Sequence, residues 1–237
     1  MSRRRPFCKY LSEYFTCAIS RHYRSGHGQT GHRYSSNHWS VVGLVASIRK
    51  NRGNMSLILN KKILDLGCGN VKSPGSIGVD LFINTEADVV ADLDAPHLPF
   101  KNETIDEIIM TDSLEHTADV RATLKEAARL LRPGGAIFIR VPHFSSLHAY
   151  SDFTHRHFFS AEGVRMLFQD NRLYNHYTIN QLEISYLRIR LWKVWRWLGI
   201  EWLANTFTQV YEKLFAFWFT AMSLEIRLTL NTKPDKN

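Results

Sequence analysis

The sequence has few cysteines, no long apolar run and, over most of its length, no excess of charge. Its three cysteines, Cys8, Cys17 and Cys68, include no Cys-x-x-Cys pair, which argues against a disulfide-bonded secreted module. The longest apolar run, residues 214–222, is about half of the roughly 20 residues that a membrane-spanning helix needs. With 13 glycines, 7 prolines and 44% apolar side chains in 237 residues, the composition is typical of one globular domain.

The formal net charge of +8 is concentrated at the amino terminus. Residues 1–54 contain ten of the 30 basic side chains and only one acid, Glu13, whereas residues 55–237 contain 20 basic and 21 acidic side chains. A main domain without a basic excess lacks the electrostatic signature of a nucleic-acid-binding surface. We therefore expect no nucleic-acid partner.

The basic segment, residues 1–54, differs in composition from the rest and is rich in Arg, Ser, His and Tyr. It is interpreted as an organelle transit peptide, as a flexible basic arm, or as an extension that precedes a natural start at Met55. Lys9 and Glu13 interrupt the apolar stretch that a twin-arginine signal would need. We predict a flexible segment over residues 1–54 and a folded domain over residues 55–232.

Short apolar strands alternate with helical segments after residue 61. Strands are predicted at residues 62–66, 76–80, 87–91, 105–110 and 136–141. A helix is predicted from Asp119, because apolar residues recur at helical spacing from Val120 to Leu131, and Pro133-Gly134-Gly135 would end it. The alternation predicts an α/β fold with a parallel sheet, whose ligands bind at the carboxyl ends of the strands.

The carboxyl-terminal third begins with a long loop and contains most of the tryptophans. We predict a loop over residues 142–159, a helix opened by Ser160, and strands over residues 182–191 and 223–230. Between these strands lie five of the six tryptophans, from Trp192 to Trp218. This stretch is interpreted either as a core helix that covers the sheet or as a membrane-surface element, since Trp beside basic residues suits an interface.

Five motifs occur in a fixed order along the chain. They are Leu64-Asp-Leu-Gly-Cys-Gly69, Val79-Asp-Leu81, Ala91-Asp-Leu93, Ser113-Leu-Glu-His116 and Leu131-Arg-Pro-Gly-Gly135. Together they resemble class I S-adenosylmethionine-dependent methyltransferases, in particular the methyltransferase type 11 group, over residues 62–144 and more loosely to residue 230. The resemblance implies a Rossmann-like seven-stranded methyltransferase sheet, mostly parallel with one antiparallel strand, and S-adenosylmethionine as the cofactor.

The segment between the first two predicted strands is short. Ten residues separate Gly69 from Asp80, and Pro74-Gly75 lies among them, so we predict a shortened first crossover helix. The third glycine of the dinucleotide fingerprint is replaced by Lys72. A helix amino terminus that could bind a pyrophosphate is therefore poorly provided, which argues against a nicotinamide cofactor.

The resemblance also assigns cofactor-binding positions. They are Asp65 and the backbone of Gly67, Cys68 and Gly69 for the methionine end, Asp80 for the ribose, Asp92 and Leu93 for the adenine, and Thr111 and Asp112 beside the sulfonium, with Leu81 as a further cofactor-binding position. An alternative for Asp65 is a structural carboxylate that caps its own turn. Cys68 is interpreted as a small space-filler, because its neighbours supply no base that would make it a nucleophile.

An oxygen or nitrogen acceptor has to lose a proton, which requires a base. The loop over residues 142–159 contains His143, His148, His155, His157 and Asp152. We predict that His143 or His155 takes the proton and that Asp152 orients it; the alternative is that these side chains only hold the loop in place. No metal site is predicted, because the alternation of His and Phe matches no metal-ligand spacing.

These observations predict a methyltransferase that acts on a small-molecule or glycan-type acceptor by O- or N-methylation in the cytoplasm. One alternative is a lipid or quinone methyltransferase with peripheral membrane contact through residues 192–218. Another is a non-catalytic S-adenosylmethionine-binding protein, and organelle targeting by residues 1–54 is a further alternative. A nucleic-acid methyltransferase is not favoured, because no Asn/Asp-Pro-Pro-Tyr tetrad follows the fourth predicted strand.

Overall fold

The structure is a computed structural model that describes residues 61–168 and 178–231. The predicted basic segment, residues 1–54, and the predicted domain start at residue 55 lie outside the described residues. Both stay predictions.

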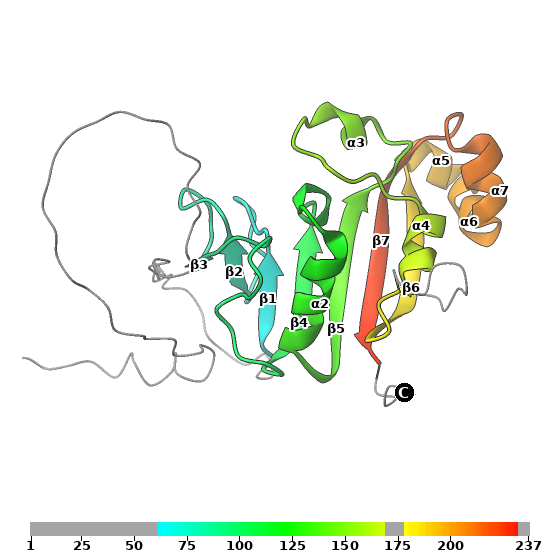
Figure 1. Ribbon diagram of the computed structural model, residues 1–237. Helices are drawn as coiled ribbons and strands as arrows, with labels where there is room; N and C mark the ends of the chain where they lie inside the picture. The colour runs from blue at the N-terminus through cyan, green and yellow to red at the C-terminus, as the bar shows by residue number, and fades with distance from the viewer. Residues whose placement is uncertain (1–60, 169–177, 232–237) are drawn as a thin grey trace, which may run out of the picture.

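A seven-stranded sheet forms the centre of the described part of the chain (Figure 1). Its strands are β1 (Ile63–Leu66), β2 (Ile77–Asp80), β3 (Val89–Val90), β4 (Ile105–Thr111), β5 (Leu131–Pro142), β6 (Leu182–Leu191) and β7 (Ala221–Leu230). They are ordered β3-β2-β1-β4-β5-β7-β6; β1 to β5 pair in parallel, and β7 is antiparallel to both β5 and β6. The predicted mostly parallel sheet with one antiparallel strand is confirmed.

Two helices, α2 (Val120–Leu130) and α4 (Ala161–Phe168), lie across one face of this sheet (Figure 1). Asp119 begins α2 as predicted, since its carboxylate accepts hydrogen bonds from the Arg121 and Ala122 amides. The helix ends at Leu130 rather than at the predicted Pro-Gly-Gly, because Leu131 already pairs with Ile105 of β4. The core between helices and sheet consists of aliphatic side chains that include Leu64, Leu66, Ile108, Met110, Leu124, Ile137 and Ile139.

The first crossover, residues 67–76, is short as expected, but it contains no helix at all, where a shortened helix was predicted. The Lys72 side chain covers β2 instead: its ammonium forms an ion pair with Asp88 at 2.6 Å, and a Cβ on Gly78 would come within 2.6 Å of the Lys72 stem. Asp88 also accepts the Gly78 amide at 2.8 Å. Without a helix, this crossover offers no helix amino terminus to a phosphate.

The tryptophan-rich stretch forms α5 (Lys193–Trp197), α6 (Ile200–Thr206), α7 (Thr208–Val210) and a π-helical turn η3 (Tyr211–Phe215) beside β6 (Figure 1). The stretch is several short helices rather than one core helix, and only part of it packs on the sheet: Ala204, Tyr211 and Ala216 belong to the core. Trp197, Trp202 and Trp218 are mostly exposed, while Trp195 packs against the core. Among the described residues, no helix combines the length and apolarity needed to cross a membrane.

Candidate active site

The strand order reverses between β1 and β4, and ligands of open α/β sheets bind outside the carboxyl ends of the strands at such a point. Gly67 follows β1 with a φ of +75°, and Ser113 follows β4. The Ser113 hydroxyl donates to the Leu66 carbonyl at 2.8 Å, while a Cβ on Gly67 would lie 2.3 Å from the Ser113 Cβ. Glycine is therefore required at position 67, and the two strand ends are held together.

Asp80 ends β2 beside this glycine turn. Its buried carboxylate accepts the Gly69 amide at 2.9 Å and the Phe82 amide at 2.9 Å, one on each oxygen. Each oxygen retains lone-pair capacity for a further donor. Leu81, Phe82 and Ile83 follow with side chains that are more than half exposed, so an apolar surface lies directly next to the carboxylate.

Asp65 and Cys68 lie behind the same turn and have structural contacts. The buried Asp65 carboxylate accepts the Ser73 amide at 2.7 Å, which fits the alternative of a carboxylate that holds its own turn. Burial, followed by the nearby Asp80 and Asp65 charges, raises the pKa of the Cys68 thiol to about 12. The thiol is therefore protonated at neutral pH, as expected for a space-filling cysteine.

The remaining predicted cofactor positions lie after β3 and at the end of β4. Asp92 is exposed and accepts the Asp94 amide at 2.9 Å, and Leu93 packs partly on the core. Thr111 is the last residue of β4, and Asp112 follows with a φ of +50° and an ion pair to Arg140 at 2.6 Å. All these positions follow parallel strands and therefore lie along one edge of the sheet.

This edge suits the cofactor that the motifs imply. A carboxylate with free lone pairs fits a ribose diol, the exposed apolar side chains after Asp80 fit an adenine face, and the space beside Gly69 is open, because a Cβ there would meet nothing within 4 Å. The first crossover, which has no helix, offers no helix amino terminus that could bind a phosphate. The donor set therefore fits S-adenosylmethionine better than a dinucleotide.

A cavity of about 910 Å³ adjoins Asp112. It lies over the carboxyl ends of β4, β5 and β6 and the start of β7, with Glu115, Arg140, His155, Arg190 and Glu225 in its wall. Arg140 is paired with Asp112, and Arg190 with Glu225 at 2.8 Å. The charged side chains of the wall are thus largely paired with one another, and the cavity lies next to the predicted sulfonium position.

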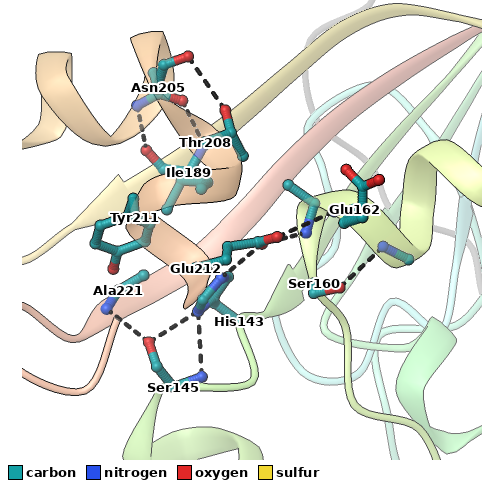
Figure 2. A network of polar contacts seen from close by, with 12 residues as sticks. His143, Ser145, Ser160, Glu162, Ile189, Asn205, Thr208, Tyr211, Glu212 and Ala221 are labelled. Atoms are coloured by element: carbon teal, nitrogen blue, oxygen red, sulfur yellow. Dashed lines mark hydrogen bonds and ion pairs between the residues drawn. The ribbon is translucent and has the colours of Figure 1, made fainter. Parts of the chain in front are cut away.

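His143, one of the two predicted bases, has no exposed surface. Figure 2 shows its ring in contact with Ser145 and Glu212. The Ser145 amide donates to His143 Nδ1 at 3.1 Å, so the ring proton is on Nε2. Nε2 lies 3.2 Å from Glu212 Oε1. Glu212 also accepts the Ala161 amide at the start of α4. The predicted role as a base does not fit this position, because neither ring nitrogen has a lone pair that the molecule to be methylated can reach. The alternative, that His143 holds the loop in place, fits its contacts.

Asp152 does not have the orienting contacts that were predicted for it. Its exposed carboxylate accepts the Thr154 amide at 2.8 Å and the Thr154 hydroxyl at 2.6 Å, and these bonds lower the pKa of Asp152. Within the described residues, no hydrogen bond joins this carboxylate to the ring of His143 or His155. Asp152 instead orders the turn through Thr154, whose hydroxyl also contacts His116 Nδ1 at 2.9 Å.

His155, the other predicted base, lines the cavity. Its Nδ1 lies 2.9 Å from the Ala149 carbonyl and donates to it, which leaves a lone pair on Nε2 of the neutral ring. The Glu115 Oε1 atom lies 3.9 Å from this Nε2. His155 is therefore the one of the two predicted bases that can accept a proton from a ligand in the cavity.

Glu115 is the residue of this site to which sequence analysis gave no role. It is 1% exposed, and neither carboxylate oxygen has a hydrogen-bond partner. Burial raises the pKa of Glu115 to about 7. Its position inside the Ser113–His116 motif was visible in the sequence, but its proximity to His155 depends on the loop that folds back over η1 (Leu114–His116).

Glu115, His116 and His155 each offer one ligand atom, and these atoms lie within 4.8 Å of one another. They are the described residues that could hold a cation, although methyl transfer does not require one. The two other loop histidines have different surroundings: the His148 ring lies 6.1 Å from the Trp192 ring, and His157 Nε2 contacts the Thr117 carbonyl at 2.8 Å.

Comparison with known families decides the class of the protein. Residues 46–183, more than half of the chain, match a family model described as a methyltransferase domain. The chain belongs to this methyltransferase family. It is an S-adenosylmethionine-dependent methyltransferase of class I fold, and its cofactor is S-adenosylmethionine.

Solved structures with a similar fold include methyltransferases of low sequence identity. An S-adenosylmethionine-dependent methyltransferase from Mesorhizobium loti is 14% identical, with 71% of this chain and 90% of that chain covered and a TM-score of 0.45. One from Archaeoglobus fulgidus is 18% identical, with 71% and 86% covered and a TM-score of 0.44. A search of curated proteins found none that matches this chain.

Proposed function

We propose that this methyltransferase transfers the methyl group of S-adenosylmethionine to a hydroxyl or amino group of a small-molecule or glycan-type acceptor in the cavity of about 910 Å³. The position of the cavity supports this, because it adjoins Asp112 at the end of β4, beside the cofactor edge of the sheet. Its paired arginines and carboxylates offer donors and acceptors to a ligand with several hydroxyl groups.

In this proposal the cofactor lies along the carboxyl ends of β1, β2 and β4. Asp80 binds the ribose hydroxyls, the backbone of Gly67–Gly69 holds the methionine end, and Leu81 and Leu93 flank the adenine. Asp65 supports the turn through Ser73 rather than by direct contact. When bound, the cofactor supplies a methyl group already activated by a positively charged sulfur, so the protein mainly has to align the acceptor.

The proton of the acceptor passes to Nε2 of His155, whose Nδ1 is already fixed on the Ala149 carbonyl. The acceptor atom would thereby keep the lone pair that takes up the methyl group supplied by the bound cofactor, whose sulfur would leave as a neutral thioether. Glu115, 3.9 Å from Nε2, compensates the positive charge that His155 acquires. This is the single observation that carries the assignment of the base: a cavity-lining histidine with a free Nε2 beside a buried, unpartnered carboxylate.

The test compares histidine variants in a methyl-transfer assay with labelled S-adenosylmethionine and a panel of sugar and small-molecule acceptors. His155→Ala should lower turnover by roughly a hundredfold or more, while cofactor affinity measured by calorimetry stays unchanged. His97→Ala, in which a mostly exposed histidine is removed, serves as the matched control. Normal turnover by His155→Ala would disprove the assignment of the base, and absence of transfer to every polar acceptor would contradict the proposed acceptor class.

A further inference from the structure

The helices between β6 and β7 expose many large apolar side chains. Trp197, Leu198, Trp202, Leu214, Phe217 and Trp218 are each 65% or more exposed, and we call these six side chains the aromatic face. The short helices that carry them pack on one another, α5 on α6 and α6 on η3, and they gather at the β6 edge of the sheet (Figure 1).

So many large exposed apolar side chains on one short stretch are unusual for a protein surface. Four of the six members of the aromatic face are aromatic, and an aromatic side chain buries roughly 150–250 Å² when it is fully covered. Apolar patches larger than a few hundred Å² are rare on monomeric proteins and mark binding surfaces. We therefore expect this surface to be covered when the enzyme works.

The charges on the same stretch indicate what covers it. Lys193, Arg196 and Lys213 are its exposed charged residues, and all three are basic. Its two acids are withdrawn from the surface: Glu201 is buried and forms ion pairs with arginines, including Arg196 at 3.3 Å, and Glu212 accepts amides of α4. Trp and Phe beside basic side chains, without exposed acids, match the interfacial region of a bilayer that carries anionic lipids.

The stretch that carries the aromatic face also adjoins the proposed acceptor site. Leu191, at the end of β6, and Arg196, on α5, both line the cavity of about 910 Å³. The Trp192 ring lies 6.1 Å from the ring of His148, which belongs to the loop that forms another part of the cavity wall. A surface bound to the aromatic face would therefore lie beside the cavity.

We propose that the aromatic face binds the enzyme to a membrane surface that carries anionic lipids, so that the cavity meets acceptors held at that surface. The acceptor class is then an amphipathic molecule whose polar part enters the cavity and whose apolar part stays in the bilayer. This second statement rests on the proposed function, whereas membrane binding does not.

The test measures co-sedimentation of the full chain with vesicles, without cofactor or acceptor. Vesicles of phosphatidylcholine mixed with phosphatidylglycerol should bind the enzyme, and vesicles of phosphatidylcholine alone should bind it several-fold less. The double variant Trp197→Ser/Trp218→Ser should reduce the bound fraction by roughly tenfold or more. Phe82→Ser serves as the matched control, because Phe82 is an exposed aromatic residue after β2, far from β6 in the strand order.

Circular dichroism establishes that each variant is folded before it is compared. Absence of binding to both kinds of vesicle, or equal binding by the double variant and the wild type, would overturn the proposal. Light scattering that shows a dimer dissolved by the tryptophan substitutions, without vesicle binding, would assign the aromatic face to a second copy of the chain instead. Vesicle binding combined with methyl transfer only to water-soluble acceptors would keep the docking surface and overturn the acceptor class.

Discussion

The substitution Glu115→Gln should stabilise the protein at alkaline pH. Glu115 is buried without a hydrogen-bond partner, and burial raises its pKa from 4.5 to about 7. A carboxyl group with a raised pKa in the folded state binds its proton more tightly there than in the unfolded chain. Its contribution is therefore fully present below pH 4.5, falls as the pH rises toward 7, and is lost above that pH.

The magnitude follows from the size of this shift. One pKa unit corresponds to about 1.4 kcal/mol, so a change from 4.5 to about 7 amounts to about 3 kcal/mol. Glutamine keeps the shape of the side chain without a charge. At pH 5 the variant should be more stable than the wild type by less than about 1 kcal/mol, whereas at pH 8 it should be more stable by about 3 kcal/mol.

Urea unfolding followed by tryptophan fluorescence at a series of pH values measures this difference. Glu183→Gln, which alters an exposed glutamate of β6, serves as the matched control. A stability difference between Glu115→Gln and the wild type that is the same at pH 5 and pH 8, or a less stable variant at pH 8, would refute the reasoning.

Three further predictions concern the glycine turn after β1, the buried Glu212 and the amino-terminal segment. Gly67→Ala should destabilise the fold by about 3 kcal/mol in urea unfolding, because it combines a positive φ with a clash against Ser113. Gly75→Ala is the matched control: its φ is +79° but the space around it is open, so it should cost about 1 kcal/mol. Glu212→Ala should lower stability by about 2 kcal/mol through loss of its buried contacts, with S-adenosylmethionine affinity unchanged in calorimetry. A chain that begins at Met55 should express, fold and bind the cofactor like the full chain; insoluble expression would contradict this.

Much of the sheet could be predicted because its signals are local. The strands predicted over residues 62–66, 76–80, 105–110 and 182–191 agree to within a residue with β1, β2, β4 and β6. Pro74-Gly75 between Gly69 and Asp80 correctly predicted a short first crossover. The end of α2 was misplaced, because the pairing of Leu131 with Ile105 is a contact between strands and not a property of the helix sequence.

The site was predicted less completely, because its geometry depends on residues that are distant in the chain. His143 and His155 have the same residue type in the same loop. What separates them is Glu212, 69 residues beyond His143, and Glu115, which precedes the loop. The tryptophans likewise matched the pattern of a core helix, and only the packing of α5 and α6 beside β6 shows that Trp197 and Trp202 are exposed while Trp195 packs against the core.

The central claim is that S-adenosylmethionine binds at the carboxyl ends of β1, β2 and β4, and calorimetric titration of the cofactor into Asp80→Asn tests it most directly. Loss of a charge-assisted hydrogen bond to the ribose, worth about 1.5–3 kcal/mol, predicts at least tenfold weaker binding. Asp106→Asn is the matched control, since Asp106 accepts the Lys62 amide at 2.6 Å at the opposite edge of the sheet, and its affinity should equal that of the wild type. Unchanged affinity in a folded Asp80→Asn variant would contradict the account.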